Sequence, residues 1–487
     1  MKISSYFTGE KLTQGQQELL VELECFLLAT NVSIFILKGY AGTGKSYLMA
    51  GVTRYLKAQN KQVVIVAPTG KAAKVIASKV GYEAKTIHRV IYSSYENDKE
   101  PSDEYIQQNQ DEIYSRIRKN EDAVDCIYIA DEASMISDKY SQSDVGKFGS
   151  GYLLQDLLRY LDIENTPNRK VIFIGDNAQL PPVRNIYSPA LDEILLNEAY
   201  QYNCQSFELT EVVRQKAESG VMKNATALRD AIEFSDFVEF EFDTSSDEVY
   251  ALLNKAFLDK YFEICNDKVE GTENSIVIAR TNKQVNDYTC DIRAKLFSPA
   301  APIQVNEKVI CVRNYQTKSN FISNGEFGRV TNILSDIECR AVEVKEKTYE
   351  GVRVTTVELR FIDVEIEFTD DHGQPYLLTR KVLLNLLYKS TPRFEGIEKQ
   401  ALHVDFYNRY LALYKPDGIG YKDAKRNDPY LNFLHIKFGY AITCHKAQGS
   451  EWRNVFVDAY HNQRMTKDYR WLYTAITRTA DKLYIKL

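Results

Sequence analysis

The sequence contains no cysteine arrangement that indicates a metal site or a disulfide framework. Its eight cysteines stand singly, with no C-x-x-C pair. No apolar run approaches the ~20 residues that a membrane-spanning helix needs. The most apolar runs, such as Ser33–Leu37, are short. The opening residues Met1–Ser5 lack the apolar core of a secretory signal. These absences exclude disulfide-rich and membrane-spanning classes, and they predict a cytoplasmic protein, or a nucleoid-associated one if the source is bacterial.

The sequence also lacks an excess of positive charge. It has 61 Lys and Arg against 67 Asp and Glu, a formal net charge of −6. No global basic field therefore predicts a polyanionic partner, and any nucleic-acid site must be a local channel. The remaining composition, 44% hydrophobic and 26% charged, is that of an ordinary globular protein. At roughly 100–200 residues per domain, the 487 residues predict about three units.

The first 208 residues alternate short apolar strands with helices. The pattern predicts strands at Ile34–Lys38, Gln62–Ala67, Ile127–Ala130 and Val171–Ile174, and helices at Ser46–Ala58 and Lys71–Val80. Continuous apolar strands separated by helices are typical of a parallel sheet covered on both faces. The polar stretch 92–122 interrupts the pattern. We therefore expect a first α/β domain of 1–91 and 123–208 with a small surface insertion.

A second α/β pattern begins near Leu209 and occupies 209–310 and 433–487. It predicts strands at Ser275–Ala279, Phe433–Ala441, Val455–Ala459 and Lys482–Lys486, and a helix at Thr281–Leu296. From 305 to about 387, β-branched runs with turns between them are typical of a small antiparallel barrel. The stretch 388–432 fits no pattern. The sequence thus predicts a β-rich insertion at 311–432 within a second α/β domain.

One segment has the form of a phosphate-binding loop. Gly39–Ser46 reads G-x-x-x-x-G-K-S and lies between a predicted strand and a predicted helix, the context this loop requires. Its main chain, with Gly39, Gly42, Thr43 and Gly44, is expected to hold phosphate at the helix N-terminus. Lys45 is expected to reach the β- and γ-phosphates of ATP, and Ser46 to hold Mg²⁺. A chance glycine-rich turn is the alternative, and the flanking strand and helix argue against it.

Polar residues that suit hydrolysis follow two of the predicted strands. Asp131 ends the strand Ile127–Ala130, where it can bind the Mg²⁺ held by Ser46, and Glu132 can deprotonate the attacking water. Gln179 follows the next strand and can hydrogen-bond the γ-phosphate or its water. The alternatives are a strand-capping acidic pair and a proline-terminated turn. A small-molecule kinase does not need Glu132, so the set favours hydrolysis over phosphoryl transfer.

Eight segments in order resemble the motif series of superfamily 1 helicases, most closely the RecD-like branch with the Dda and Pif-type helicases: GYAGTGKS, VAPTGKAA, TIHRV, DEASMI, GDNAQLPPV, VVRQ, GYAITCHKAQGSEW and LYTAITR. The resemblance runs from about Leu12 to the C-terminus. It implies two RecA-like P-loop domains with parallel sheets, a pin-like insert at 92–122 and an SH3-like insert in the second domain. Asn324–Gly328 resembles part of that second insert.

The resemblance also implies roles for further residues. Gln16 lies where these enzymes read adenine, and Gly449 and Glu451 lie where they contact the nucleotide. Arg214 and Arg478 lie where the second domain supplies arginines to the γ-phosphate, which agrees with the need for positive charge in the transition state. Judged alone, the two arginines suggest a surface salt bridge and a helix-face cation.

Contacts to a single strand are implied in the same way. The residues concerned are Pro68, Thr69, Lys71, Thr86, His88, Thr443, His445 and Lys446. Hydroxyls, main-chain amides and lysines at strand-to-helix turns suit phosphate contacts that read no sequence. Buried core histidines are the alternative for His88 and His445. In the pin-like insert, Tyr92 and Tyr95 are the residues proposed for an aromatic tip.

The sequence therefore predicts an ATP- and Mg²⁺-dependent DNA helicase that moves on single-stranded DNA and unwinds duplexes. The family branch implies 5′→3′ polarity and a place in replication, repair or recombination, with protein partners from those processes and no membrane. Two alternatives stay open. One is an RNA-directed helicase of the same superfamily, because phosphate-tracking motifs do not distinguish the two sugars. The other is a P-loop module that uses ATP as a switch to bind a protein.

Overall fold

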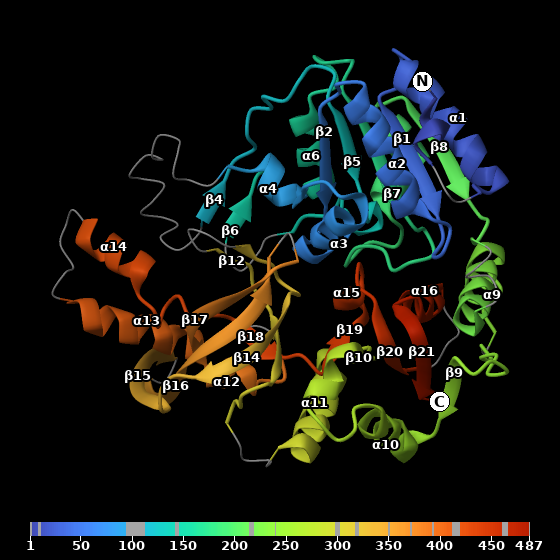
Figure 1. The fold of residues 1–487 in the computed structure, drawn as a ribbon. Helices are drawn as coiled ribbons and strands as arrows, with labels where there is room; N and C mark the ends of the chain where they lie inside the picture. Colours follow the sequence, from blue (N-terminus) through green and yellow to red (C-terminus); the bar gives the residue numbers. More distant parts are fainter. Residues whose placement is uncertain are drawn as a thin grey trace. The chain divides into compact units, whose positions relative to one another are not determined.

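The computed structural model describes residues 2–7, 11–93, 113–141, 146–213, 219–238, 240–297, 302–316, 321–348, 351–370, 373–391, 394–411, 419–459 and 466–486. The chain divides into two compact units (Figure 1). Unit 1 comprises Met1–Val249, Gln448–Glu451 and His461–Thr479; unit 2 comprises Tyr250–Ala447, Trp452–Tyr460 and Ala480–Leu487. The last forty residues therefore contribute to both units. None of the helices in the described ranges is long and apolar enough to cross a membrane.

A six-stranded parallel sheet forms the centre of unit 1. Its order is β3 (Ala84–Thr86), β2 (Val63–Ala67), β5 (Ile127–Ala130), β7 (Lys170–Gly175), β1 (Ile34–Gly39) and β8 (Cys204–Leu209). The main helices around it are α1 (Gln14–Leu28), α2 (Lys45–Ala58), α3 (Gly70–Val80), α4 (Ile87–Ile91), α6 (Leu153–Leu161) and α7 (Glu193–Glu198).

Both faces of this sheet are covered, as the continuous apolar strands predict. Along β1, Phe35 and Leu37 pack in a hydrophobic cluster with α1, α2 and α3. The alternate residues Ile34 and Ile36 pack in a second cluster with α4 and α6. Successive side chains of a strand point to opposite faces, so a strand that is apolar throughout needs a cover on each side. The predicted parallel, doubly covered sheet is confirmed.

The rest of unit 1 consists of short elements and one helix pair. The helix α9 (Gly220–Phe234) packs against α16 (Thr466–Ile476). The short strands β4 (Ile113–Ser115) and β6 (Gly146–Phe148) pair in parallel. Short 3-10 helices complete the unit: η1 (Ile3–Tyr6), η2 (Ala133–Met135) and η3 (Pro189–Leu191). Residues 94–112 lie outside the described ranges, so the pin-like insert stays a prediction.

Unit 2 contains a second α/β sheet. Its order is β19 (Ala441–Thr443), β10 (Ser275–Ala279), β20 (Trp452–Asp458), β21 (Thr479–Lys486) and β9 (Val249–Leu252). The strand β10 runs parallel to both β19 and β20. The accompanying helices are α10 (Asn254–Ile264), η4 (Glu270–Asn274), α11 (Asn282–Leu296) and α15 (Cys444–Ala447). With the sheet of unit 1, this arrangement confirms the predicted pair of RecA-like domains.

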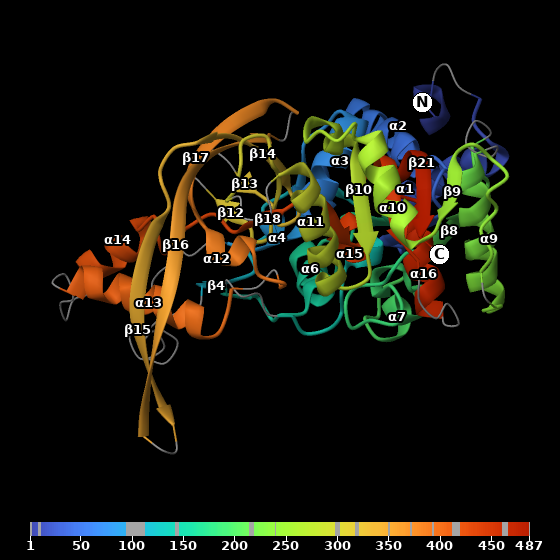
Figure 2. The same ribbon diagram turned by 90° about the horizontal axis from the view of Figure 1, so that it is seen from below.

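The β-rich insertion forms an antiparallel sheet within unit 2. Its order is β15 (Glu338–Thr348), β16 (Gly351–Thr369), β14 (Phe327–Ile333), β11 (Lys308–Cys311) and β18 (Ile436–Phe438), with β17 (Pro375–Leu383) paired to β16. The remaining elements are β12 (Tyr315–Gln316), β13 (Phe321–Ile322) and α12 (Leu384–Leu387). Figure 2 shows β15 and β16 as a long hairpin. The likeness to an SH3 fold stays a prediction.

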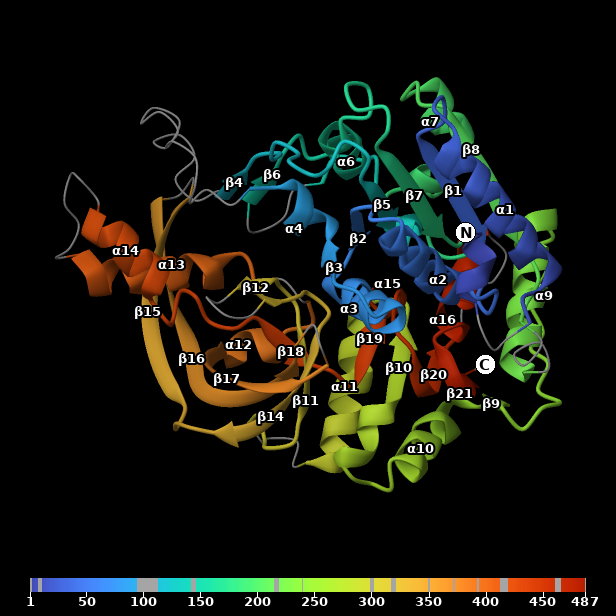
Figure 3. The ribbon, with the colours of Figure 1, turned by 45° about the horizontal axis from the view of Figure 1, so that its top comes forward.

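Two parts of unit 2 differ from the sequence pattern. The predicted strand Phe433–Ala441 is two strands in two sheets, β18 and β19. Between them the chain passes close to Phe327 at Gly439, where a Cβ would stand 3.0 Å from the ring. The stretch 388–432 contains two helices, α13 (Ile397–Tyr410) and α14 (Ile419–Asn427). Figure 3 shows α13 beside β15 and β16, on which it packs.

Candidate functional site

The loop between β1 and α2 has the geometry of a phosphate cradle. Gly42 and Gly44 have φ values of +81° and +85°, in the left-handed region that favours glycine. A Cβ on Gly44 would stand 2.8 Å from the Gln16 side chain, and a Cβ on Gly39 3.0 Å from that of Thr43. The Lys45 ammonium donates to the Gly39 carbonyl at 2.5 Å. The loop therefore directs main-chain amides and one ammonium group to the N-terminus of α2, an arrangement that suits an anion.

Gln16 lies against this loop. Its side chain is 4% exposed, and its amide Nε2 donates to the Thr43 carbonyl at 3.0 Å. Its Oε1 accepts from the Thr13 main-chain amide at 3.0 Å, which completes a capping box at the start of α1. The structure thus places Gln16 against the loop Gly39–Ser46, and both polar atoms of its side-chain amide are hydrogen-bonded. Its reading of adenine stays a prediction.

Asp131 and Glu132 follow β5 at the carboxyl edge of the sheet. Burial, with the charge of Glu132 added to it, raises the pKa of Asp131 to about 7, and the positive charge of Lys45 acts in the opposite direction. Glu132 adopts φ +51° and ψ 37°, a left-handed conformation that is uncommon for a residue with a side chain. Such strained residues concentrate at functional sites, where the surrounding fold holds them.

The oxygen donors present suit Mg²⁺ bound together with a nucleotide. Within the described ranges, no group of three or more His, Cys, Asp or Glu residues could hold a metal alone. Magnesium usually takes one or two protein oxygens and completes its shell with water and phosphate oxygens. Ser46 and Asp131 can supply these two oxygens, and a cation there would offset the cost of burying the Asp131 charge.

Gln179 follows β7 and supplies an unusual feature of the site. Its side chain is 4% exposed, and Oε1 has no hydrogen-bond partner among the described residues. A buried acceptor left unpaired costs about 1–3 kcal/mol. This unpaired acceptor lies at the same edge of the sheet as Asp131, because β5 and β7 are neighbouring strands. An incoming donor such as a water molecule would satisfy Oε1.

The predicted arginines and the Gly449 segment are placed as follows. Arg478 is 5% exposed, and its guanidinium donates to the Thr474 carbonyl and to the Thr477 hydroxyl, both at 3.0 Å. Gly449 has φ +72°, and a Cβ there would stand 3.2 Å from that of Ala72 at the start of α3. Glu451 is exposed. Arg214 lies outside the described residues.

The predicted strand-binding residues of unit 1 lie at the ends of two neighbouring strands. In the register of β2 and β3, Ala67 is opposite Thr86. Pro68 precedes Thr69 and Lys71 follows it by two residues. The Thr69 hydroxyl caps α3 by accepting from the Ala72 amide at 3.2 Å. Thr86 caps α4 in the same way, accepting from the Arg89 amide at 3.2 Å. The structure thus gathers this group of residues on one edge of the sheet.

His88 and Tyr92 belong to an aromatic cluster with Phe148. The His88 ring centroid lies 5.5 Å from that of Tyr92 and 5.3 Å from that of Phe148. Burial lowers the pKa of His88 to about 4, so the ring is neutral at pH 7 and brings no charge to a phosphate. Tyr92 is 4% exposed and donates its hydroxyl to Asp156 at 2.7 Å. The prediction of Tyr92 at an exposed tip is therefore wrong, and Tyr95 lies outside the described residues.

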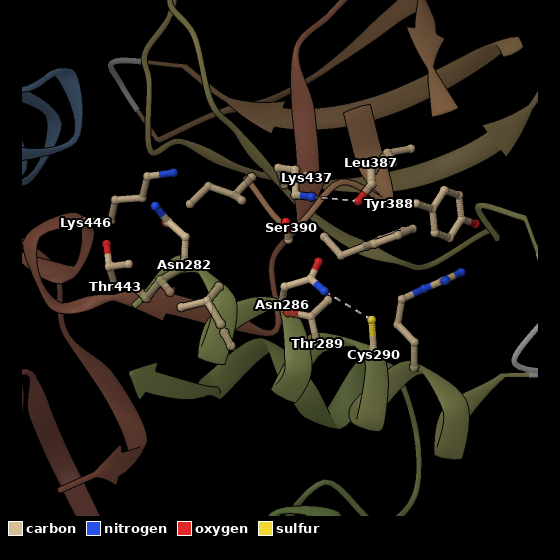
Figure 4. Close-up of a pocket in the computed structure, with 16 residues that line it drawn as sticks. Asn282, Asn286, Thr289, Cys290, Leu387, Tyr388, Ser390, Lys437, Thr443 and Lys446 are labelled. Atoms are coloured by element: carbon tan, nitrogen blue, oxygen red, sulfur yellow. Dashed lines mark hydrogen bonds between the residues drawn. The ribbon is translucent and has the colours of Figure 1, made fainter. Parts of the chain in front are cut away.

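A pocket in unit 2 contains two of the predicted strand-binding residues. Figure 4 shows Thr443, Lys446 and Asn282 near one end of it, with Lys437 further along. Within the described residues, the lining contains no carboxylate. Burial lowers the pKa of Lys446, and it lowers that of Lys437 to about 8 with the charge of Lys446 adding to the shift. The pocket is therefore electropositive. His445 is exposed and does not line it.

Asn282 was not predicted from the sequence, although a signal for it exists. The segments Ala67–Lys71 and Ala279–Lys283 both read A-x-T-x-K. In each, the threonine follows a parallel strand and caps a helix, Thr69 on α3 and Thr281 on α11. The register of β10 with β19 places Ala279 opposite Thr443, as that of β2 with β3 places Ala67 opposite Thr86. The two units therefore present equivalent sheet edges.

The phosphate cradle, the acidic pair and the presence of an α/β sheet in each unit define a P-loop protein of the RecA-like class. Residues 11–145 match the AAA domain family, and residues 438–485 match the UvrD-like helicase C-terminal domain. These two matches and the motif series agree. In both matched segments and in its motif series, the chain is similar to the superfamily 1 helicases.

Three curated relatives match nearly the whole chain. The uncharacterized protein MJ1519 of Methanocaldococcus jannaschii is 26% identical over 98% of this chain and 38% of its own length. The ATP-dependent RecD2 DNA helicase of Deinococcus radiodurans is 23% identical over 93% of this chain and 46% of its own. The ATP-dependent DNA helicase dda of Enterobacteria phage T4 is 25% identical, over 97% of this chain and 98% of its own.

Among solved structures, Pif1 helicase from Bacteroides in complex with ADP-AlF3 and single-stranded DNA matches 98% of this chain and 93% of its own, with a TM-score of 0.41 and 16% identity. The chain spans less than half of the first and second relatives and nearly all of the phage protein.

Proposed function

We propose that the protein is an ATP-dependent DNA helicase that moves 5′→3′ on single-stranded DNA and unwinds duplexes. The observation that carries this proposal is the carboxyl edge of one parallel sheet, where the loop Gly39–Ser46, the pair Asp131–Glu132 and Gln179 follow strands β1, β5 and β7. Ligands of open α/β sheets bind at this edge. The residues there have the chemistry that ATP hydrolysis requires.

Each residue of this edge has a distinct task in the proposed reaction. The loop amides and Lys45 hold the phosphates and stabilise charge on them. Ser46 and Asp131 would hold Mg²⁺, which neutralises charge on the β- and γ-phosphates when bound. Glu132 accepts the proton of the attacking water. Gln179 orients that water with its unpaired Oε1. Arg214 and Arg478 are proposed to meet the γ-phosphate.

Single-strand binding is proposed at the two equivalent sheet edges. Thr69 and Thr86 in unit 1, and Thr443 with Lys446 in unit 2, stand where parallel strands end and helices begin. Hydroxyls and amides at such turns bind backbone phosphates without reading bases. Since His88 is neutral, it adds no positive charge at these edges.

DNA is favoured over RNA because two relatives, RecD2 and dda, are named as DNA helicases. The 5′→3′ direction rests on the resemblance to the RecD-like branch. The RNA-directed alternative predicts stronger stimulation of ATPase activity by single-stranded RNA than by DNA. A protein-binding switch predicts no stimulation by either polymer.

A strand-displacement assay with tailed duplexes tests the proposed function. We expect ATP-dependent release of the short strand from a duplex with a 5′ single-stranded tail, and no release from 3′-tailed or blunt duplexes. The strand polarity of the tail is the only difference between the first two substrates. Release from the 3′-tailed duplex alone would show that the protein moves 3′→5′. No release from any substrate would contradict the helicase assignment.

Lys446→Ala is expected to weaken single-strand binding in a salt-dependent way. The lysine lies in an electropositive pocket. Loss of one phosphate contact on a single strand should reduce the magnitude of the negative slope of log K against log salt by about 0.7. The measurement is fluorescence anisotropy of a labelled oligo(dT) over a series of KCl concentrations. Lys295→Ala is the matched control, because this exposed lysine near the end of α11 pairs only distantly with Asp267, at 3.9 Å. An unchanged slope for Lys446→Ala would remove Lys446 from the strand site.

A further inference from the structure

The loop Asp176–Leu180, which carries Gln179, is bound tightly by α16 and its neighbour Gln448, all within unit 1. Arg470 donates to the carbonyls of Asn177 and Gln179. The Leu180 amide donates to the Thr474 hydroxyl at 2.8 Å, and Gln448 donates to the Leu180 carbonyl at 3.0 Å. The helix therefore fixes the main chain on both sides of the Gln179 side chain.

Tyr473 extends this set of contacts to the phosphate-binding loop. Its side chain is 1% exposed, and its hydroxyl donates to Oδ2 of Asp176 at 2.7 Å. The same hydroxyl accepts from the main-chain amide of Ala41 at 2.9 Å. One buried oxygen thus joins the loop Gly39–Ser46 to the loop Asp176–Leu180, although Tyr473 lies 297 positions after Asp176 and 432 after Ala41.

Asp176 also forms hydrogen bonds within the turn that carries Gln179. Its second oxygen, Oδ1, accepts from the Ala178 amide at 2.9 Å, and its carbonyl accepts from the Gln179 amide at 3.2 Å. The carboxylate is 1% exposed, so water does not compete for these bonds. A displacement of the Asp176 carboxylate would therefore move the main chain of Gln179.

Arg478 lies two residues beyond the end of α16. Its guanidinium donates to the Thr474 carbonyl, one residue beyond Tyr473. Burial raises the pKa of Tyr473, and the nearby positive charge of Arg478 acts against that rise. The hydroxyl is therefore neutral, and it contacts the phosphate-binding loop and Asp176 together.

We propose that Tyr473 is a positioning residue for ATP hydrolysis, whose hydroxyl holds the phosphate-binding loop and the Gln179 loop in the relative placement that the reaction requires. The inference rests on the proposed function, because the proposed function assigns Lys45 and Gln179 to the same phosphate. The amides of the phosphate-binding loop bind ATP before the reaction, whereas Gln179 acts on the water in the transition state. Loss of the hydroxyl should therefore reduce kcat more than nucleotide affinity.

Tyr473→Phe tests the inference, with Tyr469→Phe as the matched control. Tyr469 lies on the same helix, is 1% exposed and donates its hydroxyl to the Val238 carbonyl, away from both loops. ATPase kcat is measured in the full chain with saturating oligo(dT), and nucleotide Kd with a fluorescent ADP analogue. For Tyr473→Phe we expect kcat about tenfold lower, equivalent to about 1.4 kcal/mol, and an unchanged Kd. Tyr469→Phe should retain the wild-type kcat.

Thermal melting and a double-mutant cycle separate positioning from general stability. Tyr473→Phe loses two buried hydrogen bonds and Tyr469→Phe loses one, so a fall in kcat without a matching fall in melting temperature supports positioning. Asp176→Asn combined with Tyr473→Phe should lower kcat by less than the product of the two single effects, since both act through one contact. Wild-type kcat in Tyr473→Phe, or equal loss in both tyrosine variants, would overturn the inference. If oligo(dT) fails to stimulate the wild-type protein, the proposed function fails instead.

Discussion

Replacing Lys45 with alanine is expected to reduce ATP hydrolysis by a factor on the order of 10³ or more. The ammonium group donates to the carbonyls of Gly39 and Tyr40 in this loop, at 2.5 and 2.9 Å. These two contacts hold it beside the main-chain amides that would receive phosphate. Without this ammonium group, the negative charge that develops on the phosphate oxygens is stabilised less. The ammonium is already in place before the reaction and does not have to rearrange during it.

The loss should be one of catalysis and not of folding. Lys45 is half-buried at the first position of α2 and does not belong to the hydrophobic clusters of unit 1. A steady-state ATPase assay with oligo(dT) and a thermal melt are measured side by side. Lys57→Ala serves as the control, because Lys57 is an exposed lysine at the other end of the same helix. Near-normal turnover in Lys45→Ala would contradict the assignment of the loop.

Much of the fold was predictable because its strands are apolar throughout. Ile127–Ala130 and Ser275–Ala279 have the predicted bounds, since both faces of each strand are buried and the run ends at a polar residue. The pattern does not specify which strands pair. It does not indicate that β1 lies between β7 and β8, or that Gly439 separates two strands of different sheets. Those features depend on contacts between distant segments.

The candidate site divides in the same way. Lys45, Asp131 and Gln179 are local features, each in a segment that follows a predicted strand, and the structure places these segments at one sheet edge. Tyr473 could not be assigned from its sequence position, where a tyrosine among apolar residues suggests helix core. Its contacts with Ala41 and Asp176 exist only in the folded chain. For His88, the sequence left two alternatives; the ring packs among Tyr92 and Phe148, and burial lowers its pKa to about 4, so it is neutral at pH 7.

Glu132→Gln is expected to stop turnover while leaving nucleotide and Mg²⁺ binding intact. The amide has nearly the same shape as the carboxylate but cannot accept a proton from the attacking water, a loss worth roughly 10²–10⁴-fold in rate. Glutamine also has the same backbone requirements, so the left-handed conformation at φ +51° is kept at similar cost. Asp131, the proposed Mg²⁺ ligand, is unchanged. The measured quantities are kcat, and the Kd of a fluorescent ATP analogue with and without Mg²⁺.

The same variant distinguishes a general base from a structural carboxylate. If Glu132 accepts the proton, the variant retains ATP, and its oligo(dT) affinity with ATP should match that of the wild type with a non-hydrolysable analogue. Glu198→Gln, an exposed carboxylate at the end of α7 in the same unit, should behave as the wild type in every assay. A collapse of nucleotide affinity in Glu132→Gln, or its loss only when Mg²⁺ is present, would make Glu132 a structural or metal-binding group. The water would then need another base, and the proposed division of roles between Asp131 and Glu132 would be wrong.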